Sequence, residues 1–171
     1  MHDTTQKYAL VTGASRGIGL AIAESLAREG YQLYLTCRHN RDRLDSLAKN
    51  LSEKYAVSCI PLPTDMGNPD EVDSLFAQIE TLDVLINNAG TQNEADIDIN
   101  LKALIHITEK YGVQDQIRSI LNIGSASGHT GSEFPEYCAS KGGVLAYTKN
   151  AAMRVAGFGA TCNSLDPGGV L

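Results

Sequence analysis

The chain has 171 residues, of which 43% are hydrophobic and 20% are charged, and its formal net charge is −6. This length and balance predict a globular protein in which residues 1–171 form one domain with a real core. The net negative charge gives no general support for binding nucleic acid or an anionic membrane surface.

Signals for a membrane span, secretion or a metal site are also missing from the sequence. No apolar run approaches the length of a bilayer-spanning helix, and the first residues show no signal-peptide pattern. The four cysteines stand singly, without metal-ligand spacing, at Cys37, Cys59, Cys138 and Cys162. We therefore expect free thiols, no metal site and a cytoplasmic protein.

Strand-like and helix-like segments alternate along the whole chain. Short runs rich in Val, Ile, Leu and Tyr predict strands at 8–12, 31–37, 56–62, 82–88, 118–124 and 160–165. The amphipathic stretches between them predict helices at 17–29, 40–54, 69–80, 98–110 and 137–157. Strict alternation predicts an α/β fold with a doubly wound parallel sheet of at least six strands.

Two helix ends are marked by particular residues. Before the helix at 69–80, Asn68 can cap, Pro69 suits the first helical position, and Glu71 can complete a capping box. Gly30 is a suitable stop for the first helix.

A glycine-rich segment, "TGASRGIG", follows the first strand directly and opens the first helix. Gly13, Gly17 and Gly19 would permit a tight turn, close approach of the backbone to a pyrophosphate, and close helix–strand packing. A purely structural turn is the alternative. The position between a strand and a helix favours a nucleotide-binding loop.

Tyr137 and Lys141 are four residues apart in the last predicted helix, and so lie on one face of it. A cation that close favours the deprotonated phenol, which suits a general acid or base. Taken alone, the same pair would also fit a solvated helix face.

Several short motifs occur together in a fixed order: "TGASRGIG", Asp65, "NNAG" at 87–90, Asn100, Ser125, "YCASK" at 137–141 and "NSLDPGG" at 163–169. In this the chain resembles the short-chain dehydrogenase/reductase family of single-domain Rossmann-fold enzymes. Its glycine loop is most similar to the 3-oxoacyl-carrier-protein reductase branch. The resemblance implies hydride transfer between NADP(H) and a small-molecule carbonyl or secondary alcohol. Sugar, polyol, steroid-like and xenobiotic substrates all stay open.

The resemblance also implies a role for each catalytic residue. Tyr137 would give a proton to the carbonyl oxygen, and Lys141 would bind the nicotinamide ribose. Ser125 would hydrogen-bond the same oxygen, with Ser127 and Ser132 as rival serines. Asn100 would hold a water in the proton relay, although an asparagine there could instead bend or cap a helix.

The residues that the resemblance assigns to the cofactor are spread over most of the chain. Asp65 would contact the adenine, and the segment from Asn87 to Gly90 would support the adenosine side, with Asn87 more a structural brace than a chemical group. The full set is Gly13, Ser15, Arg16, Gly17, Ile18, Gly19, Arg38, Asp65, Met66, Asn87, Ala89, Gly90, Tyr137, Lys141, Pro167 and Gly168.

The end of the second strand bears on the choice of cofactor. NAD-preferring relatives carry an acidic residue there, whereas this chain has Cys37 followed by Arg38, with Arg16 in the glycine loop. The planar fork of arginine suits a 2′-phosphate. We therefore expect NADP(H) in preference to NAD(H); a solvated basic turn is the alternative.

The last predicted helix carries an apolar stripe in "LAYTKNAAM" and two adjacent glycines, Gly142 and Gly143. In the family this helix commonly packs against a partner subunit, which implies a homodimer or homotetramer. Burial within the chain's own core is the alternative. The glycines suggest close approach of the backbone to the cofactor or to another helix.

The chain departs from the family pattern in its intervals and at its end. Three intervals are short, and the sequence stops three residues after Gly168, where relatives continue into a substrate-covering lid and a seventh strand. Our hypothesis is that residues of the complete polypeptide are missing from this sequence; an intact mass near 18.3 kDa would exclude it.

A minimal, inactive NADP(H)-binding sensor is the rival function, and an oligomerisation module is a third. The intact Ser-Tyr-Lys set argues against the sensor, and only the last helix favours the oligomerisation module.

Overall fold

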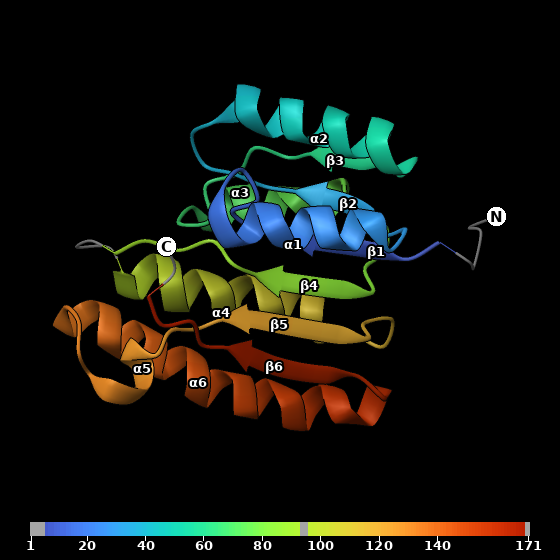
Figure 1. Cartoon of the computed structure of the whole chain (residues 1–171). Helices are drawn as coiled ribbons and strands as arrows, with labels where there is room; N and C mark the ends of the chain where they lie inside the picture. The colour runs from blue at the N-terminus through green and yellow to red at the C-terminus, as the bar shows by residue number, and fades with distance from the viewer. Residues whose placement is uncertain (1–5, 93–95, 170–171) are drawn as a thin grey trace.

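The computed structural model describes residues 6–92 and 96–169, and within them six strands form one sheet in the order β3-β2-β1-β4-β5-β6. Every pair of neighbouring strands is parallel. The strands are β1 (Tyr8–Val11), β2 (Gln32–Leu35), β3 (Cys59–Pro61), β4 (Val84–Asn87), β5 (Ser119–Ile123) and β6 (Thr161–Leu165). Figure 1 shows β3 with α2 at one end of the sheet and β6 with α6 at the other. The predicted doubly wound fold is confirmed.

Helical segments connect the strands. The α-helices are α1 (Gly17–Arg28), α2 (Arg41–Tyr55), α3 (Pro69–Ser74), α4 (Ala103–Ile107), α5 (Ser127–Thr130) and α6 (Pro135–Val155). Short 3₁₀ turns follow α3 and α6 as η1 (Leu75–Ala77) and η4 (Ala156–Phe158), while π-helical turns flank α4 as η2 (Ile97–Lys102) and η3 (Thr108–Gly112). In the described part of the chain, every helix is too short or too polar to cross a membrane.

Side chains alternate between two cores on opposite faces of the sheet, as expected for buried parallel strands. In β1, Leu10 packs with residues of α3, α4 and α6, whereas Ala9 and Val11 pack with residues of α1 and α2. On the second face, a groove of about 560 Å³ lies beside α1 and extends over β4 and β5. Both cores leave the carboxyl ends of the strands open to carry the site.

Three features differ from the predicted helices, and a local hydrogen bond accompanies one of them. The helix expected at 69–80 is α-helical only to Ser74, and α5 was not predicted. The helix expected at 98–110 contains two π-helical turns. At the second of them Thr108 Oγ1 donates to the Leu104 carbonyl at 2.7 Å, a back-bond of the kind that bends helices.

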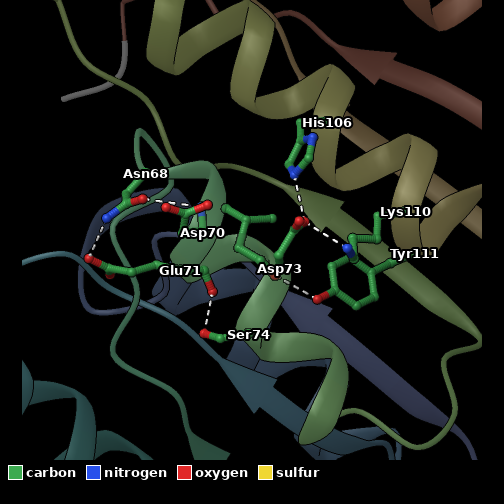
Figure 2. A network of polar contacts seen from close by, with 9 residues as sticks. Asn68, Asp70, Glu71, Asp73, Ser74, His106, Lys110 and Tyr111 are labelled. Atoms are coloured by element: carbon green, nitrogen blue, oxygen red, sulfur yellow. Dashed lines mark hydrogen bonds and ion pairs between the residues drawn. The ribbon is translucent and has the colours of Figure 1, made fainter.

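The expected start of α3 is confirmed in part. Asn68 is the N-cap and accepts from the Asp70 N–H at 3.1 Å, and Pro69 is the first helical residue. The expected capping box is wrong, because Glu71 does not bond the Asn68 backbone. Glu71 accepts instead from the Asn68 side-chain amide at 3.0 Å (Figure 2) and from the Asp65 N–H at 2.8 Å. These bonds fix the turn that carries Asp65.

A polar network joins α3 to the α4 region on the outside of the sheet (Figure 2). Asp73 Oδ1 lies 2.7 Å from Lys110 Nζ and 2.9 Å from His106 Nε2. Hydrogen bonds from Lys110 and His106 hold the pKa of Asp73 below its ordinary value. Tyr111 OH donates to the Val72 carbonyl at 2.7 Å. Lys110 and Tyr111, both in η3, are therefore each bonded to a residue of α3.

Glycines allow close contacts where the chain turns or helices touch. Gly30 follows the end of α1 with φ +85°, which confirms the predicted helix stop. A Cβ at Gly143 would lie 2.5 Å from Leu101 Cδ2, so the close approach expected there is to a helix of the same chain.

Candidate functional site

A cleft of about 580 Å³ opens where β1, β2, β3 and β4 end. The strand order reverses between β1 and β4, the place at which open α/β sheets bind ligands. Most residues predicted for the cofactor line this cleft, namely Gly13, Ser15, Arg16, Gly17, Ile18, Arg38, Asp65, Met66, Ala89 and Gly90. Sequence reasoning missed Thr36, His39, Asn40, Thr64, Asn88, Thr91 and Ile99, and had named Cys37 only as the occupant of the acidic position.

The glycine loop forms the tight floor of the cleft. Gly13 and Gly17 have positive φ values of +65° and +57°, which other residues rarely adopt. A Cβ at Gly13 would lie 2.9 Å from Ala89 Cα, and one at Gly19 would lie 2.4 Å from Asn88 Nδ2. Gly19 does not line the cleft; it packs between α1 and the chain after β4, as close helix–strand packing requires, and its cofactor contact stays a prediction.

The N-terminus of α1 opens into this cleft and suits an anion. Arg16 is the N-cap and makes no side-chain cap bond, and the first turn of the helix contains no acidic residue. Backbone N–H groups of a first helical turn lack partners within the helix and lie at the positive end of the dipole. Together with the close glycine floor, this end of α1 fits the pyrophosphate of a dinucleotide.

The far end of the cleft is ionic. Arg38 Nε lies 3.0 Å from Asp65 Oδ2, and both side chains are partly exposed on the wall of the cleft. Asp65 Oδ1 also accepts from the Gly67 N–H at 2.9 Å, which fixes the carboxylate at the start of its turn. The structure thus brings together the arginine and the aspartate that the sequence assigned to the adenosine end.

A second hollow of about 350 Å³ adjoins the cleft and shares wall residues with it, among them Arg16 and Gly90. Its remaining wall contains three of the predicted catalytic residues, Ser125, Tyr137 and Lys141. Pro167 and Gly168, predicted to contact the cofactor, line it as well. The ends of β4, β5 and β6 and the start of α6 thus bring distant sequence motifs to one place.

Ser125 is the candidate serine that lines this hollow; in the described chain Ser127 and Ser132 do not. Its Oγ accepts from the Ser127 N–H at 3.2 Å, which leaves the hydroxyl proton to be donated elsewhere. The Ser132 hydroxyl is exposed and lies 2.8 Å from Thr130 Oγ1. The geometry therefore favours Ser125 among the three.

Lys141 reaches the hollow from the buried face of α6. Its side chain is 6% exposed, and Nζ donates to the Ile123 carbonyl at 2.8 Å. Burial lowers the pKa of Lys141 to about 8, while the charges of Asp96 and Asp166 act in the opposite direction. Lys141 Nζ also lies 5.8 Å from the centre of the Tyr137 ring, so the two side chains are neighbours on one face of α6, as the sequence predicted.

Asn87 and Asn100, which the sequence assigned to the site, lie behind the walls of the two hollows. Asn87 Nδ2 donates to Thr108 Oγ1 and to Asn122 Oδ1, each at 2.8 Å, so Asn87 braces β4 and does not line the cleft. The Asn100 side chain is fully buried and bonds both backbone groups of Thr91. Its side chain does not line the second hollow, and a part in the proton relay stays a prediction.

Asn88, which the sequence reading passed over as part of "NNAG", links the two halves of the site. Its Nδ2 donates to the carbonyls of Thr12 and Gly13 at 2.9 and 3.0 Å. The backbone N–H groups of Asn88 and Ala89 both donate to Thr12 Oγ1. The sequence signal that could have identified Asn88 is a polar residue directly after a buried strand, opposite the glycine loop.

Comparison with known proteins agrees with this geometry. A family model described as short chain dehydrogenase matches residues 7–171. The chain belongs to the short-chain dehydrogenase family. It is 35% identical to the 3-oxoacyl-[acyl-carrier-protein] reductase FabG of Rickettsia bellii, over 98% of this chain and 74% of that protein.

Solved structures of dehydrogenases and reductases have the same fold. L-sorbose reductase from Gluconobacter frateurii, complexed with NADPH and L-sorbose, superposes with a TM-score of 0.89 at 29% identity, covering 97% of this chain and 70% of that one. NAD⁺-bound xylitol dehydrogenase gives a TM-score of 0.84 at 30% identity, covering 95% and 70%. The predicted family, and with it a dehydrogenase/reductase acting on CH–OH and C=O groups with NAD(P), is confirmed.

Proposed function

We propose that this short-chain dehydrogenase is NADP(H)-dependent and transfers hydride between the nicotinamide and a carbonyl or secondary alcohol. One observation carries the proposal: Ser125, Tyr137 and Lys141 line a single hollow, and that hollow shares Arg16 and Gly90 with the nucleotide cleft. A dinucleotide that lies along the cleft would therefore end where the acid–base groups are gathered.

The chemistry follows from the groups in the hollow. When bound, NADPH supplies the hydride that adds to the carbonyl carbon. Negative charge then develops on the carbonyl oxygen, so hydrogen-bond donors aimed at that oxygen stabilise the transition state. Tyr137 donates the proton, and Ser125 donates a hydrogen bond with the hydroxyl proton that the Ser127 N–H leaves available. Lys141 holds a positive charge beside the ring of Tyr137 and favours the phenolate that remains.

Substitution of Tyr137 by Phe tests the assigned acid. Tyr137→Phe keeps the ring and removes the hydroxyl, so kcat should fall by about 10³-fold while the Kd of NADPH changes less than about twofold. Tyr147→Phe is the matched control, because Tyr147 lies on the same helix and lines neither hollow. Turnover is measured by NADPH oxidation with simple ketones, keto sugars and 3-oxoacyl thioesters.

Unchanged turnover in Tyr137→Phe would refute the assigned acid. A wild-type chain that binds NADPH yet reduces no member of the panel would instead identify a nucleotide-binding protein without turnover. The keto sugars and thioesters enter the panel because relatives are named as reductases of such substrates.

The preference for NADP(H) rests on Arg38, which lies at the end of β2 on the cleft wall beside Asp65. Arg38→Ala should raise the Kd of NADPH about tenfold and that of NADH less than twofold, since only the former carries a 2′-phosphate. Arg43→Ala, an exposed arginine of α2 that does not line the cleft, is the control. Equal increases in the Kd of NADPH and of NADH would overturn the proposed preference. Both Kd values are measured by fluorescence titration.

A further inference from the structure

The chain after β6 continues to pair with the loop that carries Ser125. The Gly124 N–H donates to the Leu165 carbonyl at 2.8 Å, and the Ala126 N–H donates to the Pro167 carbonyl at 2.9 Å. Asp166 lies between these two bonds, and so directly opposite the loop. The position of Ser125 therefore depends on the segment from 165 to 167.

The Asp166 carboxylate is held against this loop. Its Oδ2 accepts from Ser164 Oγ at 3.0 Å and lies 3.4 Å from His129 Nε2. Its Oδ1 is buried and has no hydrogen-bond partner in the described chain. A Cβ at Gly124 would collide with that oxygen, so the carboxylate fills the space that glycine leaves open.

This carboxylate also acts on the buried cation of the site. Lys141 Nζ donates to the Ile123 carbonyl, next to Gly124, against which the Asp166 carboxylate lies. The negative charges of Asp166, just after β6, and Asp96, just before η2, both favour the protonated form of Lys141. His129 faces the same carboxylate from α5. A buried ammonium needs compensating negative charge, because burial alone favours the neutral amine.

We propose that Asp166 is a positioning residue of the active site, which locks the Ser125 loop against the end of β6 and supports the ammonium of Lys141. The assignment rests on the proposed function, since Ser125 and Lys141 act in the hydride transfer proposed above. Asp166 itself does not line the catalytic hollow and so acts through these two residues.

The test removes the negative charge of the Asp166 side chain and keeps its shape. Asp166→Asn should lower the midpoint of the Lys141 Nζ titration, followed by NMR of the labelled lysine, by about half a pH unit or more. The alkaline limb of the pH–kcat profile should move the same way, with kcat at pH 7 about fivefold lower and KM for NADPH changed less than twofold. Asp98→Asn, an exposed carboxylate paired with Lys102, is the control and should leave all three unchanged.

Each outcome decides one claim. An unmoved Lys141 midpoint and an unchanged kcat in Asp166→Asn would overturn the assignment. The NMR titration needs no substrate, so a chain without turnover would refute the proposed function while the titration still decides the electrostatic role of Asp166. If Asp166→Asn does not fold, Gly124→Ala serves instead, because its Cβ would displace the carboxylate from the loop and should produce the same shift in the Lys141 midpoint. An unmoved midpoint there too would refute the proposal.

Discussion

Lys141 holds its charge in a buried position, and this burial costs stability. Its side chain is 6% exposed, and burial lowers its pKa from 10.5 to about 8. Below pH 8 both the folded and the unfolded chain carry the proton, so the cost of burying the charge is fully present. Between about pH 8 and 10.5 only the unfolded chain keeps it, so stability rises with pH through this window.

We therefore expect the stability difference between Lys141→Met and the wild type to depend on pH. Methionine removes the charge and keeps a chain of similar length, so its relative advantage should shrink by about 2–3 kcal/mol between pH 7 and pH 10.5. Urea unfolding of both proteins without cofactor at several pH values gives this difference, in which the other titrating groups cancel. A difference that is flat with pH would mean that the ammonium is well solvated in the folded chain.

For single residues, the sequence predicted which residues belong to the site better than which groups they contact. Ser125, Tyr137 and Lys141 could be placed in one site because spacing and motif order mark them, and they do line one hollow. Asn87 was predicted to be a structural brace, and it is one, but its partners and those of Asn100 could not be predicted, because a motif does not say which way an amide points. Asn87 bonds Asn122 on the neighbouring strand β5, and Asn100 bonds Thr91, which lies nine residues earlier in the chain.

The segment around α4 shows how one side chain joins several elements. Asn100, in η2, accepts from the Thr91 N–H at 2.7 Å and donates to the Thr91 carbonyl at 2.8 Å. It also donates to Ser140 Oγ of α6 at 3.2 Å. Since Thr91 lines both hollows, this amide holds part of the site wall against two helical segments.

Asn100→Ala should lower the free energy of unfolding by about 2–4 kcal/mol, because it leaves partly buried backbone groups of Thr91 without partners and removes the buried bond to Ser140 Oγ. Asn50→Ala, an exposed asparagine within α2, should change it by less than about 0.5 kcal/mol. Urea unfolding compares the two. Equal effects would show that the Thr91 bonds contribute nothing beyond helix propensity.

Element boundaries could be predicted where local chemistry sets them and not where tertiary contacts do. Asn68, Pro69 and Gly30 mark helix ends through their own backbone and side-chain preferences, and the structure confirms those ends. The π-helical turns around α4 carry no such mark. Their apolar spacing reads as an ordinary helix, whereas the bonds of Asn100 to Thr91 accompany the first π-helical turn and the back-bond of Thr108 to the Leu104 carbonyl accompanies the second.

The whole-molecule topology could be predicted because it depends on a few general rules. Alternating strands and helices, joined by right-handed crossovers, leave little choice but a doubly wound parallel sheet. The structure adds the strand order, β3-β2-β1-β4-β5-β6, which alternation alone does not determine. The same order explains the site, since the loops after β1, β2, β3 and β4 all meet at the cleft.

Because the loops after four strands build the cleft, a nucleotide bound there should stabilise the whole fold. At about one hundred times its Kd, NADPH should add about 2.7 kcal/mol, which corresponds to a rise of about 5–10 °C in the unfolding midpoint of a chain this long. The fragment 2′,5′-ADP can occupy only the nucleotide cleft, where Arg38 lies, so it should still raise the midpoint. At the same concentration 5′-AMP, which lacks the 2′-phosphate, should raise it less. Differential scanning fluorimetry measures all three, and equal shifts for the two fragments would show that the cleft does not read the 2′-phosphate.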